Sequence, residues 1–225
     1  MNTPLKLTPE AHPIRIFMAV AISEAIREKL TGIQVRLKQA GADVGWVAPV
    51  NIHLTLLFLG TVFESQASAL AAAIDGITAV YQPCTLEIKG IGYFGRAQSP
   101  RVIWAGLTGN CLTGNRLTGN CLTDDLQPLL ALQCEIASAA KRTGIFSDDK
   151  PFHPHLTIGR VRSSRRAKEL LHAIEPCRDT ALGPLVIKSV RLMKSELTAQ
   201  GPIYTMLHES RLSAKHDFVP TLKTS

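Results

Sequence analysis

The sequence lacks the features of a secreted, zinc-binding or membrane-spanning protein. Its five cysteines are an odd number, and no two of them form a Cys-x-x-Cys pair. This pattern argues against a disulfide framework or a zinc knuckle and is typical of a reducing compartment. The first apolar run, residues 14–22, is much shorter than a membrane span and lacks the layout of a signal peptide. We therefore expect a cytoplasmic protein that is not inserted in a membrane.

Acidic side chains are fewer than basic ones. The 225 residues include 25 Lys and Arg but 18 Asp and Glu, so the formal net charge is +7. A basic excess indicates an anionic partner, most often nucleic acid, although a merely basic protein has the same excess. Part of the positive charge lies in one basic cluster: Arg162, Arg165, Arg166 and Lys168. This cluster is either a solvated helix face or a surface that binds an RNA backbone.

Alternating helix and strand patterns predict an α+β fold. Strands are expected at residues 15–20, 52–59, 85–93, 101–107 and 156–161, and a closing hairpin at 185–197 and 203–212. Helices are expected from a cap at Ser23, at 65–80, at 124–142 and from about 162 to 176. The first helix has its apolar stripe at Ile26, Leu30, Ile33 and Leu37. Short strands linked by hairpins favour an antiparallel sheet over a parallel one.

Residues 106–125 divide into four similar pentads, each containing Leu-Thr. They are either a small repeat module or a duplicated loop. Four pentads are too short to bury a core of their own, and long loops tolerate insertions at little thermodynamic cost. We therefore interpret residues 107–123 as a loop insertion in a single domain of residues 1–213, which is followed by a polar tail at 214–225.

One short phrase occurs twice, as His53-Leu54-Thr55-Leu56 and as His155-Leu156-Thr157-Ile158. Side chains alternate faces along a strand, so each phrase places its His and Thr on one face and its apolar residues on the other. A lone strand histidine is usually structural, but two copies in predicted strands indicate a site. Four of the other five histidines are in polar or terminal surroundings and are expected to be solvated: His12, His172, His208 and His216.

Two imidazoles and two hydroxyls suit displacement at a phosphodiester. One histidine can be neutral while the other is protonated, which makes a general base and a general acid. The hydroxyls can donate to the non-bridging oxygens of a phosphate, so no metal is required. Two alternatives remain. His53, His153 and His155 could form a three-His metal site, or the protein could be a non-catalytic RNA-binding module.

The chain resembles the 2H phosphoesterase superfamily, and within it the RNA 2′,3′-cyclic phosphodiesterases, also called 2′-5′ RNA ligases. The resemblance rests on both phrases and on residues 15–17, 46–60, 94–95, 101–104, 154–160 and 196–204. It implies a bilobal α+β fold, with two antiparallel sheets facing across a central cleft and helices on the outside. It also implies hydrolysis of the 2′,3′-cyclic phosphate at an RNA end to a 2′-phosphate without metal or cofactor. The same site run in reverse could join 2′,5′ ends.

The resemblance also implies roles for single residues. His53 corresponds to the proton donor and His155 to the proton acceptor, while Thr55 and Thr157 correspond to phosphate-contacting threonines. A recurrent arginine that follows the second motif corresponds to Arg160. His153 stands where relatives often have arginine, and it is expected to contact the substrate less strongly. The implied partner is an RNA or oligonucleotide with a cyclic phosphate end, and we expect the protein to be a monomer.

Overall fold

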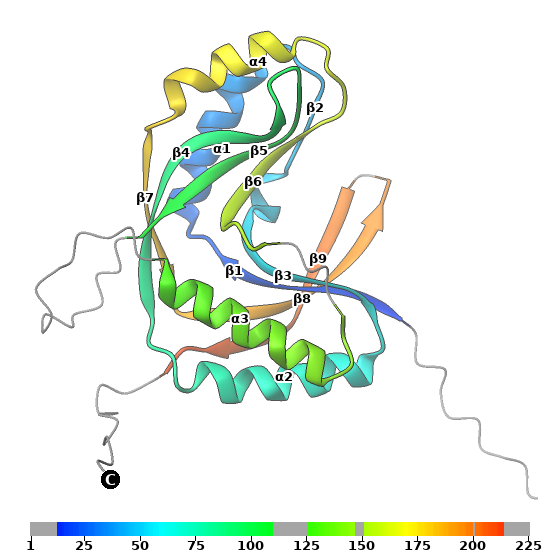
Figure 1. The fold of residues 1–225 in the computed structure, drawn as a ribbon. Coiled ribbons are helices and arrows are strands. Elements are labelled where there is room, and N and C mark those ends of the chain that lie inside the picture. The colour runs from blue at the N-terminus through cyan, green and yellow to red at the C-terminus, as the bar shows by residue number, and fades with distance from the viewer. Residues whose placement is uncertain (1–12, 110–125, 147–150, 200, 214–225) are drawn as a thin grey trace, which may run out of the picture.

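The computed structural model describes residues 13–109, 126–146, 151–199 and 201–213 and shows two lobes joined at their sheets (Figure 1). The strand order is β7-β4-β5-β6-β3-β1-β8-β9, with β2 beside β6, and every described pairing is antiparallel. The upper lobe contains β2 (Val44–Trp46), β4 (Cys84–Arg96), β5 (Ser99–Thr108), β6 (His155–Val161) and β7 (Ala181–Ile187). The lower lobe contains β1 (Ile14–Ala21), β3 (His53–Val62), β8 (Ser189–Thr198) and β9 (Gly201–Arg211).

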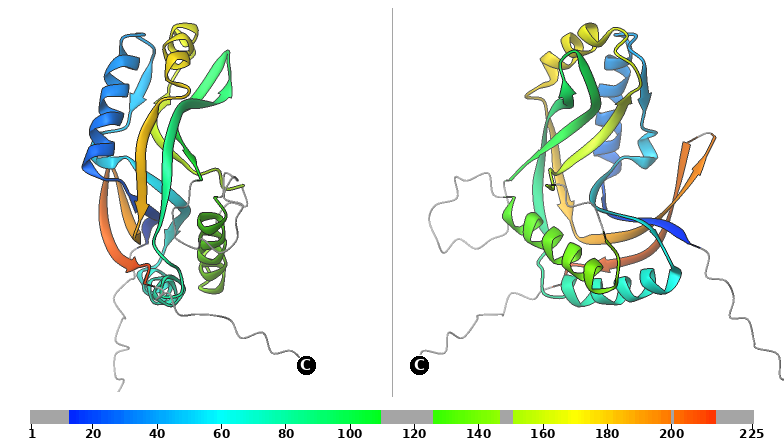
Figure 2. Two further views of the ribbon diagram at one scale, coloured as in Figure 1. Left: turned by 90° about the vertical axis from the view of Figure 1, so that its left-hand side faces the viewer. Right: turned by 45° about the vertical axis from the view of Figure 1, so that its right-hand side comes forward.

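Two helices pack on the outside of each lobe (Figure 2). The upper pair is α1 (Glu24–Lys38) and α4 (Ala167–Ile174), and the lower pair is α2 (Glu64–Thr78) and α3 (Gln127–Arg142). Two 3-10 turns, η1 (Pro49–Asn51) and η2 (Glu175–Cys177), complete the described elements. The predicted bilobal α+β class is confirmed, and the two half-sheets form one continuous, curled sheet because β3 pairs with β6.

The first helix, α1, contacts the strand that carries the second His-Thr phrase. Ser23 caps α1, since its Oγ accepts the backbone N–H of Ile26 at 3.4 Å. Three residues of the expected stripe are fully buried, Ile33 is half-buried against the core, and Gln34 is buried as well. The Gln34 amide donates to the carbonyls of Val47 and Ile158, both at 2.8 Å. A buried polar side chain with both donors satisfied stabilises this position, and it holds α1 against β6.

The closing hairpin differs from the prediction. The expected strand 185–197 is divided at Lys188 into β7, which pairs with β4, and β8, which pairs with β1. The burial pattern changes phase there, because Leu185 and Ile187 are buried at odd positions and Val190 and Leu192 at even positions. The chain thus passes from the upper to the lower lobe within one apolar stretch. The hairpin of β8 and β9 itself is confirmed.

Some predicted segments lie partly or wholly outside the described residues. The pentads from residue 110 onward and the tail at 214–225 are among them, whereas the first pentad begins inside β5, which runs to Thr108. The fourth predicted helix starts later than expected, at Ala167. Within the described ranges, no helix combines the length and apolar character needed to cross a membrane.

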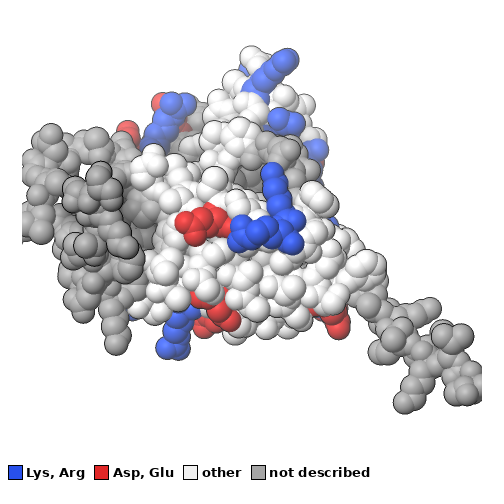
Figure 3. Space-filling model, turned by 60° about the horizontal axis from the view of Figure 1, so that its bottom comes forward, with Lys and Arg blue, Asp and Glu red and all other residues white. Residues whose placement is uncertain are grey.

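The underside of the lower lobe carries little charge. Figure 3 shows separate groups of Lys and Arg side chains, some of them next to Asp or Glu, with most of the visible described surface uncharged. This face therefore carries no single continuous basic patch among the described residues that are visible.

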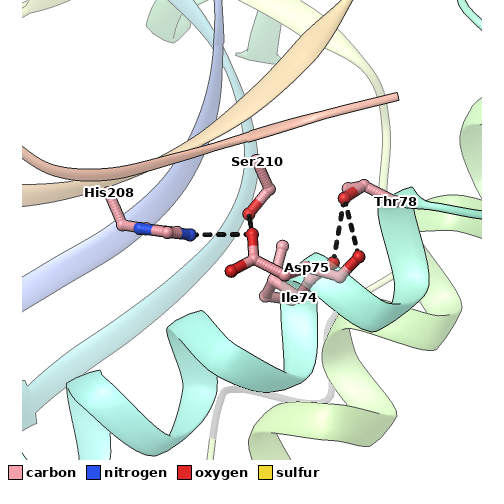
Figure 4. Close-up of polar contacts among 5 residues, drawn as sticks. All are labelled: Ile74, Asp75, Thr78, His208 and Ser210. Atoms are coloured by element: carbon pink, nitrogen blue, oxygen red, sulfur yellow. Dashed lines mark hydrogen bonds and ion pairs between the residues drawn. The ribbon is translucent and has the colours of Figure 1, made fainter. Parts of the chain in front are cut away.

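A set of polar contacts in the lower lobe joins α2 to β9 (Figure 4). Asp75 Oδ1 accepts the Ser210 hydroxyl at 2.6 Å and lies 2.8 Å from His208 Nε2. The hydrogen bonds from Ser210 and His208 lower the pKa of the Asp75 carboxyl. His208, expected from the sequence to be merely solvated, thus holds a helix against the sheet.

Candidate active site

The junction of the two lobes brings the two His-Thr phrases together. Leu54 of β3 and Leu156 of β6 are Cα partners, and each side chain is 0% exposed. Directly opposed residues of antiparallel strands point to the same face. The side chains on either side of these leucines therefore project to the opposite face, here called the motif face. They are all half-buried: His53, Thr55, His155 and Thr157.

His53 is held by backbone and by aromatic rings. Its Nδ1 lies 2.7 Å from the carbonyl oxygen of Asn51. The Phe17 ring stacks on the imidazole at a centroid distance of 4.9 Å and 26° between planes, and Tyr204 meets it edge-on at 5.4 Å. The His53 imidazole is therefore held on one side by Phe17 of β1 and on another by Tyr204 of β9.

His155 has a matching environment in the upper lobe. Its Nδ1 lies 2.6 Å from the carbonyl oxygen of His153, again the residue two positions earlier. The Phe94 ring stands perpendicular to it, at 4.9 Å and 89°, and Phe94 in turn contacts Trp104 at 5.4 Å. Each imidazole is thus positioned by one carbonyl and by aromatic contacts, two for His53 and one, from Phe94, for His155.

These contacts decide which nitrogen can exchange a proton. A carbonyl oxygen only accepts hydrogen bonds, so Nδ1 must carry the hydrogen in both histidines. Nε2 is then free to accept a proton in the neutral ring or to donate one in the charged ring. The two phrases therefore present two chemically equivalent Nε2 atoms, either of which could act as acid or base.

Burial lowers the pKa of both imidazoles. For His53 the loss of solvent is the main cause, and the bond to the Asn51 carbonyl partly opposes it. For His155 the loss of solvent is again the main cause, the bond to the His153 carbonyl opposes it, and the charges of Arg160 and His153 add to it. Both rings are therefore biased toward the neutral form.

The other predicted site residues lie around His155. Arg160 is exposed on β6 and acts electrostatically on His155 and on Tyr204. His153 is exposed, and it is its carbonyl rather than its ring that contacts His155. The three histidines weighed as metal ligands do not form such a site, because no group of three His, Cys, Asp or Glu within the described ranges is arranged to hold an ion.

Sequence reasoning missed several residues that shape the site. Asn51 donates its side-chain amide to the Pro202 carbonyl at 2.9 Å, which ties the turn before His53 to the β8–β9 hairpin. Tyr204 also contacts Phe17, with centroids 4.9 Å apart. Burial raises the pKa of its phenol, and the positive charges of Arg160 and Arg15 oppose that shift. No local pattern marks these residues, because each is brought to the site by long-range pairing.

The basic cluster lies away from the motif face. It follows the end of β6, about 20 Å along that strand from His155 at the usual rise per residue. Lys168 also lines an open pocket of about 420 Å³ beside α4, together with Tyr93, His172 and Arg178. The cluster is therefore remote from the imidazoles, beyond the far end of β6.

Comparison with known proteins identifies the class. The family model described as LigT like Phosphoesterase matches residues 20–104 and 122–204. The chain belongs to this family and is a phosphoesterase. Among similar proteins is the RNA 2′,3′-cyclic phosphodiesterase of Methanothermobacter thermautotrophicus, 31% identical over 88% of this chain and 99% of that protein. The protein of the same name from Aquifex aeolicus is 33% identical over 87% of this chain and 96% of its own length.

Solved structures agree with this assignment. The protein TT0787 of Thermus thermophilus is 25% identical and has a TM-score of 0.70, with 90% of this chain and 100% of that chain covered. Escherichia coli LigT complexed with 3′-AMP is also 25% identical, with a TM-score of 0.66 over 89% of this chain and 99% of that chain.

Proposed function

We propose that the protein hydrolyses the 2′,3′-cyclic phosphate at an RNA end to a 2′-phosphomonoester. The observation that carries the proposal is the Leu54–Leu156 pairing, which places two His-Thr pairs on one face with both Nδ1 atoms bound to carbonyls. Relatives of similar length named RNA 2′,3′-cyclic phosphodiesterase support the substrate. The positive net charge suits an anionic substrate.

The proposed reaction uses one histidine on each side of the phosphorus. Neutral His155 removes a proton from water through Nε2, and the water oxygen forms a bond to phosphorus. The bond between phosphorus and the 3′-oxygen breaks, and protonated His53 gives its Nε2 proton to that oxygen. Thr55 and Thr157 donate hydroxyl hydrogen bonds to the non-bridging oxygens as negative charge develops there. The positive charge of Arg160 favours the same anionic centre.

The same arrangement permits ligation. An RNA 5′-hydroxyl in place of water would attack the cyclic phosphate and give a 2′,5′ bond, with the same two proton transfers. We propose hydrolysis as the main reaction, because water is present at far higher concentration than RNA ends.

The proposal is tested with an oligoribonucleotide that ends in a 2′,3′-cyclic phosphate. The expected product is the 2′-phosphate, with turnover unchanged after exhaustive chelation, because two imidazoles and two hydroxyls supply the proton transfers and charge stabilisation. Product identification by mass spectrometry and phosphatase sensitivity is the measurement. Activity lost with chelator and restored by Zn²⁺ or Mn²⁺ would favour the metal-dependent alternative. Tight RNA binding without turnover would favour the binding module.

The pH dependence follows from the two lowered pKa values. We expect kcat/KM, which reflects the free enzyme, to have its optimum on the acidic side of the ordinary histidine value of 6.5. Below the optimum the base becomes protonated, and above it the acid loses its proton. The two apparent pKa values of the profile belong to the pair of histidines and not to either one alone. Bound phosphate stabilises the charged ring, so the kcat profile should be displaced to higher pH. A kcat/KM optimum well above 7 would contradict the dominant influence of burial.

A further inference from the structure

Asn51 makes two hydrogen bonds that link His53 to a distant part of the chain. Its backbone carbonyl oxygen lies 2.7 Å from His53 Nδ1, and its side-chain Nδ2 lies 2.9 Å from the carbonyl oxygen of Pro202. A carbonyl only accepts hydrogen bonds, so the Asn51 amide must donate to Pro202. The carbonyl that holds the imidazole is therefore itself held by the β8–β9 hairpin, 151 positions further along the chain.

The end of this hairpin extends past its neighbouring strand. β8 pairs with β1 as far as Lys194, whereas its pairing with β9 continues to Thr198. Figure 1 shows this end of the hairpin standing clear of the rest of the sheet. It carries Tyr204, whose ring meets His53 edge-on at 5.4 Å. The Asn51 side chain thus fixes the position of the hairpin end relative to the imidazole.

The second histidine is supported differently. Its Nδ1 lies 2.6 Å from the carbonyl oxygen of His153, a residue that is exposed. Among the residues that the structure describes, no hydrogen bond from the His153 side chain joins it to another element. The long-range bond of Asn51 therefore belongs to the first phrase, whose His53 is the proposed acid.

We propose that Asn51 is a positioning residue for the acid, because its bond to Pro202 holds the carbonyl that fixes the tautomer and orientation of His53. The tautomer of a histidine is set by the hydrogen bond that its other ring nitrogen makes. A carbonyl held at Nδ1 leaves Nε2 to carry and transfer the catalytic proton. The proposal rests on the proposed function, in which His53 protonates the leaving oxygen.

Loss of the Asn51 side-chain bond should also change the pKa of His53. The Asn51 carbonyl favours the charged ring and partly opposes the effect of burial. A carbonyl that is no longer held in place should therefore lower the pKa of His53 further.

The groups that face His53 come from three strands. β1 contributes Phe17, and β9 contributes the Tyr204 phenol, whose pKa is raised by burial. The charges of Arg15 on β1 and Arg160 on β6 reach that phenol, and β6 also contributes the titrating ring of His155. These groups are the same in every Asn51 variant, so a change in the titration of His53 reports the Asn51 bond.

The first test observes the ring in the free enzyme by nitrogen-15 NMR of the histidine side chains. Asn51→Leu keeps the size of the side chain but has no donor. It should lower the pKa of His53 and add the Nε2–H tautomer to the neutral ring, while Asn51→Gln, which retains an amide donor, should be less affected. The signals of His53 are identified by their absence from His53→Ala, and those of His155 should not change.

The second test measures activity. On the cyclic oligonucleotide, Asn51→Leu should lower kcat by about 10- to 100-fold, because a displaced acid is poorly aligned with the leaving oxygen. The alkaline limb of the kcat/KM profile should move to lower pH. A nitrophenyl phosphodiester needs no acid, so most of the loss should disappear on that substrate. The matched control is Thr198→Val, which removes another bond from a side chain to a hairpin carbonyl, to Gly201 at 2.7 Å.

The NMR measurement separates this proposal from the proposed function. A changed tautomer and pKa of His53 in Asn51→Leu support the positioning role even if the cyclic phosphate is not hydrolysed, in which case the proposed function alone fails. An unchanged His53 ring, equal losses on both substrates, or the same effects in Thr198→Val would overturn the positioning role. Thermal unfolding checks each variant, and Asn51→Ala, with the same expected results, replaces Asn51→Leu if the latter does not fold.

Discussion

Replacing either His53 or His155 by alanine is expected to lower the rate of cyclic-phosphate hydrolysis on the order of 10²–10⁴-fold. Each change removes a proton-transfer group whose Nδ1 is fixed by a carbonyl and whose Nε2 is available for transfer. The double variant should be little slower than the slower single variant, because the two rings act as a unit. Steady-state rates on the cyclic oligonucleotide are the measurement, and His172→Ala, a change on the exposed surface of α4, is the control.

The roles of the two histidines can be separated with a nitrophenyl phosphodiester, whose leaving group needs no proton. If His53 is the acid, His53→Ala should be largely rescued on this substrate, while His155→Ala should remain slow. The opposite result would reverse the assignment. Single variants that keep nearly full activity on the cyclic phosphate would contradict the catalytic proposal and leave the binding module.

Removing either threonine hydroxyl is expected to lower kcat by about 10²–10³-fold, the usual effect of losing one donor to a developing oxyanion. Thr55→Val and Thr157→Val keep the branched shape on strands β3 and β6, so the fold should be retained. The corresponding serine variants retain the hydroxyl and should recover most of the activity.

The measurement for the threonines is kcat together with the affinity for the 2′-phosphate product. Thr205→Val, an exposed change on β9, is the matched control. Valine variants with wild-type kcat would show that the hydroxyls do not contact the reacting phosphate. A loss confined to KM would assign them to binding rather than to the transition state.

Much of the local structure could be predicted from the sequence because it depends on short-range periodicity. The period of two in the repeated phrase predicts that His53 and Thr55 share a face opposite buried Leu54, as the structure shows. The cap at Ser23 was likewise predictable, since a capping residue acts on its own first turn. Gln34 was not, because its amide is satisfied by the carbonyl of Ile158, 124 residues further along the chain.

Choice of strand partners could not be read from local patterns. The apolar stretch around Lys188 has the composition of one strand, yet β7 and β8 pair in different lobes. Periodicity shows which side of a strand is buried, whereas pairing depends on which other strands reach it. The Leu54–Leu156 pairing, which brings the two phrases together, likewise depends on which strands meet and not on local periodicity.

The sequence by itself determined the chemistry available to the site, which is two imidazoles and two hydroxyls. Each histidine projects from the same side of its strand as the threonine two residues later. Only the tertiary structure decided their environment. Phe17 and Tyr204 reach His53 from β1 and β9, and the Asn51–Pro202 bond spans 151 residues. Burial by these distant groups lowers the pKa of His53, because solvent exclusion is a property of the assembled lobes and not of any segment of the chain.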